Sequence, residues 1–225
     1  MKRKYGVAVL LCTLGLAAGI VGCFASGSPF EAGRLEAGKP GSGKDAVTMI
    51  QLTDREKAIA SLSGDVIAAM EIRFPADTGS RELYLEEWIN GEKASSELLI
   101  QGDGEEHGVY YISSDIENHE DGTWAGTRWK IMSENEGVRT VTGDLHTVFP
   151  EGKRAKIGSS GIYGENEAEN RKQDEYVLAA RCFQFDKDFI ETVSCSDMAE
   201  DDHVFEKYDY VVLVRLVVGG SSLVE

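Results

Sequence analysis

The segment Tyr208-Asp-Tyr-Val-Val-Leu-Val-Arg-Leu-Val-Val218 decides the fold. In an extended backbone its side chains alternate between two faces. One face is wholly apolar, and the other interrupts its apolar residues only with Asp209 and Arg215. A strand that is apolar on both faces is typical of the interior of a covered sheet. We therefore predict that residues 208–218 form a central strand.

Shorter segments with the same alternation precede this strand and are separated by turn residues. In the clearest of them, Glu71 and Arg73 point away from a face of apolar residues. Asn90-Gly91 predicts a tight hairpin turn. Strands are predicted over Val47–Leu52, Val66–Phe74, Glu82–Asn90, Ser95–Ile100, Gly108–Ser113, Trp124–Met132, Val138–Phe149, Lys156–Tyr163 and Tyr176–Phe185.

One helix is predicted, near the start of the folded part. Thr53 and Glu56 have the spacing of a capping box, so we expect a helix over Asp54–Ser63 that ends at Gly64. Together with the strands, this helix predicts a mainly β fold. The expected architecture is an antiparallel β-sandwich, of which an immunoglobulin-like arrangement is one form, with one short N-terminal helix.

The first residues have the layout of an export signal. Lys2, Arg3 and Lys4 precede an apolar run that ends in Ile20-Val21-Gly22-Cys23. This ending resembles the lipobox of bacterial lipoproteins. The resemblance implies that the signal is cleaved between Gly22 and Cys23 and that the Cys23 sulfur carries a diacylglyceryl group.

Other fates of this leader remain open. The apolar run is near the lower length limit for a membrane-spanning helix, so an uncleaved anchor is one alternative. Cleavage after Ala25 or Ser26 would instead release a soluble protein. An intracellular protein with an apolar N-terminus is the third alternative.

Composition divides the chain into three parts: a signal peptide over residues 1–22, a linker over 23–45 and one β-rich domain over 46–225. Glycine, serine, proline and charged residues dominate the linker, which predicts a flexible tether. Within it, Gly38 to Lys44 resembles a phosphate-binding loop. The resemblance fails at Asp45, where such a loop has the hydroxyl that binds magnesium.

The charge of the chain excludes some partners. The net charge is −16, and removal of Lys2, Arg3 and Lys4 with the leader takes it to −19. Such an acidic protein lacks the basic surface that nucleic acids require, and it is not attracted to anionic lipid. The expected membrane contact is therefore the lipid anchor alone, and the acidity is expected to keep the domain soluble.

Two of the four cysteines belong to the leader, Cys12 and Cys23. The other two, Cys182 and Cys195, lie thirteen positions apart in the domain. Export permits a disulfide between them. The alternative is a pair of reduced cysteines, since the sequence does not determine the distance between their Cα atoms.

No metal-binding, cofactor-binding or catalytic motif is recognised. The four histidines, His107, His119, His146 and His203, lack metal-ligand spacing, and the acidic loops lack the calcium pattern. The adjacent carboxylates of Glu86 and Glu87 are predicted to point to opposite faces of a strand. The tryptophans Trp88, Trp124 and Trp129 suit either a sugar-binding surface or, as we favour, packing in the core.

The whole layout resembles small exported bacterial lipoproteins. That resemblance implies a location on the extracytoplasmic face of the cell membrane, held by the lipid anchor. The expected function is a non-enzymatic binding or interaction module for a protein or an envelope ligand. The alternatives are a cell-envelope hydrolase or carbohydrate-binding protein, which would gather a histidine and two acidic residues in a concave site, and an acidic metal-binding sensor or chaperone.

Overall fold

The structure is a computed structural model that describes residues 46–55, 66–74, 79–103, 105–135, 138–155, 157–163, 175–192 and 194–219. All of them belong to one compact unit, Gly43–Glu225. The predicted signal peptide and most of the predicted linker precede this unit, and residues 1–45 lie outside the described residues.

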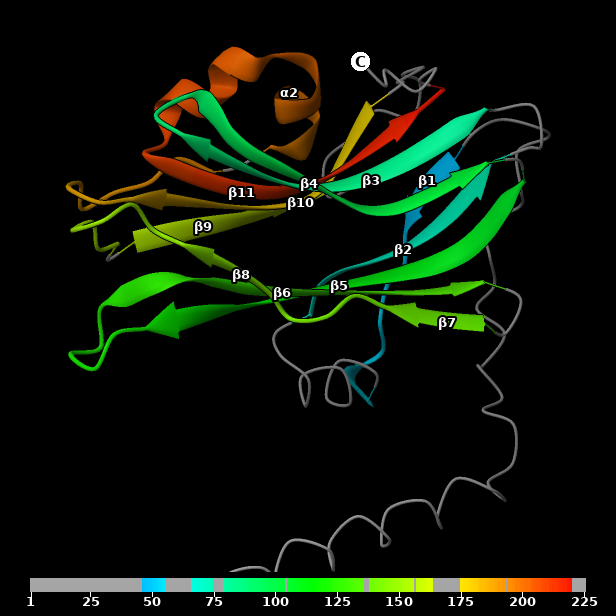
Figure 1. The fold of residues 1–225 in the computed structure, drawn as a ribbon, viewed down its shortest axis with the longest axis horizontal. Helices are drawn as coiled ribbons and strands as arrows, with labels where there is room; N and C mark the ends of the chain where they lie inside the picture. Colours follow the sequence, from blue (N-terminus) through cyan, green and yellow to red (C-terminus); the bar gives the residue numbers. More distant parts are fainter. Residues whose placement is uncertain are drawn as a thin grey trace, which may run out of the picture. The chain divides into compact units, whose positions relative to one another are not determined.

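The described residues form two antiparallel sheets that lie as two layers (Figure 1). The six-stranded sheet has the order β1-β2-β5-β6-β7, with β8 also paired to β6, and the five-stranded sheet has the order β4-β3-β11-β10-β9. The predicted antiparallel sandwich is therefore confirmed. The strands are β1 (Ala46–Met49), β2 (Val66–Phe74), β3 (Ser80–Ile89), β4 (Glu92–Asp103), β5 (Glu106–Asn118), β6 (Trp124–Asn135), β7 (Val138–Val141), β8 (Leu145–Val148), β9 (Ile157–Ile162), β10 (Glu175–Gln184) and β11 (Tyr210–Val218).

The last strand, β11, is central as its sequence predicts. It lies between β3 and β10, and eight of its nine residues are buried. An immunoglobulin domain has its last strand at a sheet edge. The strand order of this sandwich therefore differs from that of an immunoglobulin domain.

Several turns follow from local chemistry. Asn90 and Gly91 both have positive φ, 51° and 85°, so the predicted hairpin turn joins β3 to β4. The predicted strand Val138–Phe149 is interrupted between β7 and β8. There Thr142 binds the backbone of Ile131 through both its own N–H and its side-chain oxygen, which replaces regular pairing.

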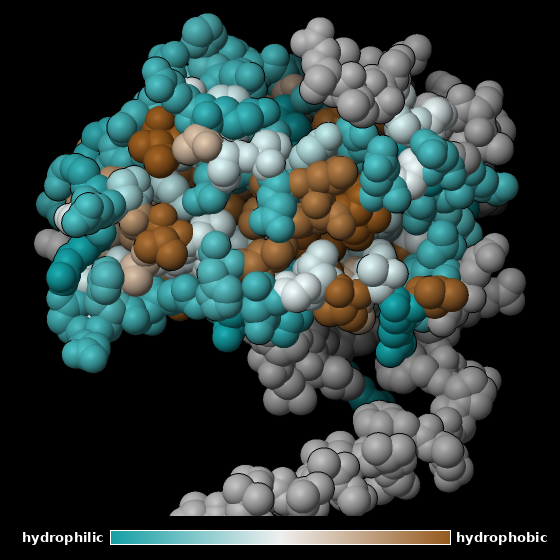
Figure 2. All heavy atoms as spheres, viewed as in Figure 1, coloured by the Kyte–Doolittle hydropathy of each residue, from teal (hydrophilic) through white to brown (hydrophobic). Residues whose placement is uncertain are grey.

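The main hydrophobic core lies between the two sheets. Its apolar side chains come from the inward positions of β2, β5 and β6 on one side and of β3, β10 and β11 on the other. On the face seen in Figure 2, hydrophobic residues lie between the layers with hydrophilic residues on both sides. The largest fully buried members include Trp129, Tyr210, Phe74, Phe183, Met70 and Ile112.

A second cluster lies on the outer face of the five-stranded sheet, beneath α2 (Cys195–Glu200) and the 3₁₀ helix η1 (Asp202–Lys207) (Figure 1). We call α2 and η1 together the cap. The Ser194 hydroxyl accepts the Asp197 N–H at the start of α2, and Asp201 ends α2 and begins η1. The sequence predicted neither helix.

The predicted N-terminal helix begins where expected. Asp54 and Arg55 are helical, and the rest of Asp54–Ser63 lies outside the described residues.

Candidate functional site

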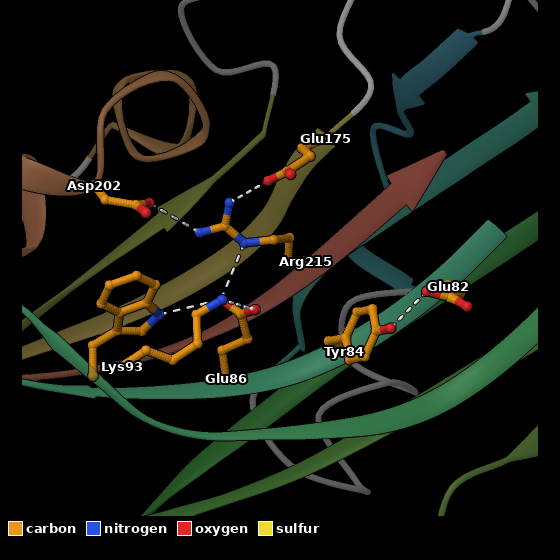
Figure 3. A network of polar contacts seen from close by, with 8 residues as sticks. Glu82, Tyr84, Glu86, Lys93, Glu175, Asp202 and Arg215 are labelled. Atoms are coloured by element: carbon orange, nitrogen blue, oxygen red, sulfur yellow. Dashed lines mark hydrogen bonds and ion pairs between the residues drawn. The ribbon is translucent and has the colours of Figure 1, made fainter. Parts of the chain in front are cut away.

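A buried polar network lies on the outer face of the five-stranded sheet, with Arg215 and Glu86 at its centre (Figure 3). Their side chains are 6 % and 3 % exposed, and Arg215 Nε donates to Glu86 Oε2 at 3.0 Å. The two residues are diagonal neighbours, because Arg215 pairs with Tyr84 and Glu86 pairs with Leu213. Burial of both charges is tolerable because each neutralises the other.

Two further donors engage Glu86. Trp88 Nε1, two residues along the same face of β3, donates to Oε2 at 3.2 Å. Lys93 Nζ, which comes from β4, donates to Oε1 at 2.7 Å and lies 5.0 Å from the centre of the Trp88 ring. Both oxygens of this carboxylate are therefore occupied by donors of the protein itself.

The guanidinium of Arg215 also contacts the neighbouring strand and the cap. Nη1 donates to Glu175 Oε2 at 2.6 Å, and Nη2 lies 3.6 Å from Asp202 Oδ1, too far for a hydrogen bond. Asp202 opens η1, and Phe205 in the same helix stacks on Trp88 with ring centres 4.1 Å apart. These contacts connect β3, β4, β10, β11 and the cap.

Glu87 belongs to a different network on the inner side of the sheet. Its carboxylate accepts a short hydrogen bond from the Tyr210 hydroxyl and another from Ser95 Oγ at 2.8 Å. Burial, reinforced by the nearby carboxylate, raises the pKa of Tyr210 well above its usual range. The prediction that Glu86 and Glu87 point to opposite faces is confirmed.

The inner network continues across the core. The Thr147 hydroxyl contacts Tyr210 and lies 2.6 Å from the Thr127 hydroxyl. Thr127 Oγ1 in turn accepts Trp129 Nε1 at 2.7 Å. Because Tyr210 belongs to β11 while the threonines belong to β8 and β6, these bonds join the two sheets through the core.

Three histidines each pair with one glutamate. The distances are 3.0 Å for His107–Glu71, 2.9 Å for His146–Glu117 and 2.8 Å for His203–Glu206. These imidazoles are 61 %, 51 % and 83 % exposed, so they lie on the surface. Glu206 raises the pKa of His203, with a smaller contribution from Asp201. The fourth, His119, lies in the turn before β6.

The tryptophans pack as predicted. Trp129 is fully buried between the sheets and Trp88 is buried beneath the cap. Trp124 is half-buried and meets the Phe183 ring edge to face, with centres 6.0 Å apart. Core packing therefore accounts for them.

The two domain cysteines lie in one buried cluster. Cys182 belongs to β10, and Cys195 is the first residue of α2. Their sulfurs are not bonded to each other. Burial, and to a lesser extent the neighbouring Cys195, raises the pKa of the Cys182 thiol. The predicted cleavage and lipidation residues Gly22 and Cys23 lie outside the described residues.

Within the described part of the chain, no group of three or more histidine, cysteine and acidic side chains is placed to hold a metal ion. No helix among the same residues has the length and apolarity needed to cross a membrane. Comparison of the chain with protein families, with curated proteins and with solved structures finds no match.

The networks around Arg215 and Tyr210 were not predicted. One signal was present, since an arginine within an apolar strand needs an acidic partner when it is buried. The sequence could not name that partner, because Glu86 lies 129 positions away and the pairing depends on strand register.

Proposed function

We propose that the chain is a lipoprotein held at the extracytoplasmic face of the cell membrane, with its β-sandwich as a non-enzymatic binding or interaction module. The observation that carries the proposal is the sequence Ile20-Val21-Gly22-Cys23, placed directly after a basic start and an apolar run. The partner is a protein or another component of the cell envelope.

The lipid provides the attachment in this proposal. A single acyl chain binds membranes only marginally, whereas two chains anchor a protein stably. The acidic domain itself has little attraction for anionic lipid. Residues 24–45 lie in the sequence between the proposed anchor at Cys23 and the β-rich domain.

The polar networks connect secondary-structure elements within the domain. Glu86, Arg215 and Glu87 bond to groups of the same protein, and their contacts join secondary-structure elements. The alternative is a hydrolase of the cell envelope, for which we expect a histidine and two acidic groups gathered in a concave site. The three paired histidines are instead exposed and each bonds to one glutamate.

Mass spectrometry of the mature N-terminus tests the proposal. The full chain, expressed in bacteria with its leader and extracted from membranes, is expected to begin at Cys23 with a diacylglyceryl group. Cys23→Ala should abolish lipidation and leave the leader attached. Cys12→Ala is the matched control within the leader and should be processed normally. An unmodified Cys23, or an intact leader in the wild-type protein, would overturn the proposal.

A further inference from the structure

The fold places both cysteines of the domain in one buried cluster. Cys182 lies on the outer face of β10, where it pairs across the sheet with Val211. Cys195 starts α2, and Cys195 and Met198 are the buried residues of that helix. Both cysteines belong to the cluster between the sheet and the cap, and α2 packs against β10, the strand that carries Cys182.

Local structure fixes the position of each cysteine. Residue 182 is held between β11 and β9, with Val211 and Ser159 as its register partners. Residue 195 directly follows Ser194, whose hydroxyl accepts the Asp197 N–H and so defines the first turn of α2. Cys195 also lies near enough to Cys182 to contribute, after burial, to the raised pKa of the Cys182 thiol.

We propose that Cys182 and Cys195 form a disulfide in the exported protein. This inference rests on the proposed function, since export takes the chain to a compartment where disulfides persist. An Sγ–Sγ bond forms as each thiol loses a proton and an electron. The disulfide of a thiol–disulfide oxidoreductase accepts the two electrons and the two protons and is itself reduced to two thiols.

The proposed processing removes competing thiols. Cys12 leaves with the leader, and the sulfur of Cys23 is occupied by its thioether to the lipid. Only Cys182 and Cys195 then remain for pairing in a single chain. The bond would close the loop of residues 183–194 and attach the start of the cap to β10 covalently.

Peptide mapping of the full membrane-extracted chain tests this pairing directly. The protein is denatured in the presence of an alkylating reagent and without a reductant. It is then cleaved after lysine and arginine. Cleavage at Arg181, Lys187 and Lys207 places Cys182 in peptide 182–187 and Cys195 in peptide 188–207. We expect these peptides to be linked and unalkylated, and to separate and take up reagent once a reductant is added.

Two separate alkylated peptides from the unreduced protein would overturn the disulfide. The same map reports the peptide that contains Cys23, so loss of lipidation is read independently of the pairing. A chain that is lipidated but alkylated at both domain cysteines therefore refutes this inference alone. A chain with an intact leader refutes the proposed function.

Thermal unfolding provides a second measurement. Reductant should lower the melting temperature of the wild-type chain by about 6–12 °C, because the bond restricts a short loop of the unfolded state. Cys182→Ala and Cys195→Ala should each abolish this response. Met198→Leu retains both thiols in the same helix and should keep it. A wild-type melting temperature that does not respond to reductant contradicts the proposal.

Discussion

Arg215 on β11 and Glu86 on β3 form an ion pair at 3.0 Å although both side chains are almost completely buried. A donor from β4 and an acceptor from β10 complete the pair, and Asp202 of the cap forms a longer ion pair with Arg215. Such a pair is costly to break, because removal of one partner leaves the other as an uncompensated buried charge.

Arg215→Ala should therefore lower the free energy of unfolding by about 3–5 kcal/mol, as measured by chemical denaturation. Replacement of both partners by apolar residues, Arg215→Met with Glu86→Leu, should cost less than Arg215→Ala alone. The double variant leaves no buried charge at this site, because the Lys93 side chain is 43 % exposed and can turn to solvent. The matched control is Arg139→Ala, which breaks an exposed pair with Glu134 and should cost about 1 kcal/mol or less. Equal losses for Arg215→Ala and Arg139→Ala would contradict this account.

Tyr210→Phe should destabilise the sandwich by about 1–3 kcal/mol, since it removes the hydroxyl that connects Glu87 to the threonines of the other sheet. Chemical denaturation measures this loss. Tyr84→Phe removes a hydroxyl that binds Glu82 at a half-exposed position, and it should cost about 0.5 kcal/mol or less. A Tyr84→Phe loss as large as that of Tyr210→Phe would refute the role of the inner network.

Gly126→Ala should disrupt the pairing of β6 with β8. A Cβ atom at position 126 would collide with the backbone oxygen of Thr147, which is held in register with the neighbouring strand. We expect a loss of about 1–3 kcal/mol or more in the free energy of unfolding. Gly143→Ala, at a site with nothing within 4 Å of the added carbon, is the control and should be tolerated. Similar stability of the two variants would show that β8 is not held as described.

The free energy of unfolding should fall at alkaline pH, because several tyrosines have a higher pKa in the folded protein than in the unfolded chain. The hydrogen bond to Glu82 raises the pKa of Tyr84 to about 12, and burial raises the pKa values of Tyr110, Tyr208 and Tyr210 further. Unfolded tyrosine ionises near pH 10, so the unfolded state releases protons first and is favoured above that pH.

Chemical denaturation at a series of pH values between about 8 and 11 checks this expectation. The free energy of unfolding should be steady below pH of about 10 and then decline, with phenolate absorbance appearing on unfolding. Tyr210→Phe should show a shallower decline than the wild type. Unchanged stability across the range would contradict the direction of these pKa shifts.

Elements with strong local patterns could be predicted from sequence. Val66–Phe74, where Glu71 and Arg73 point away from an apolar face, forms β2 with the predicted bounds, and Asn90-Gly91 forms the hairpin turn. The cap could not be predicted in the same way. Cys195–Glu200 is a short helix with only two buried residues, too few to show a helical period.

The contacts of the polar networks could not be predicted from the sequence either, for a different reason. The sequence shows that Arg215 and Glu86 are present, but their contact requires β3 and β11 to be neighbours in one particular register. A shift of one residue would send Glu86 to the opposite face. Lipidation at Cys23 remains a prediction, because that residue lies outside the described part of the chain.

The position of β11 has a consequence for the timing of folding. Among the described strands, β11 is the last in the sequence and lies at the middle of the five-stranded sheet, so β3 and β10 have no neighbour between them until β11 has been synthesised. An unfinished chain therefore cannot close this sheet or build the main core. Closure of the five-stranded sheet is therefore coupled to the arrival of β11 between β3 and β10.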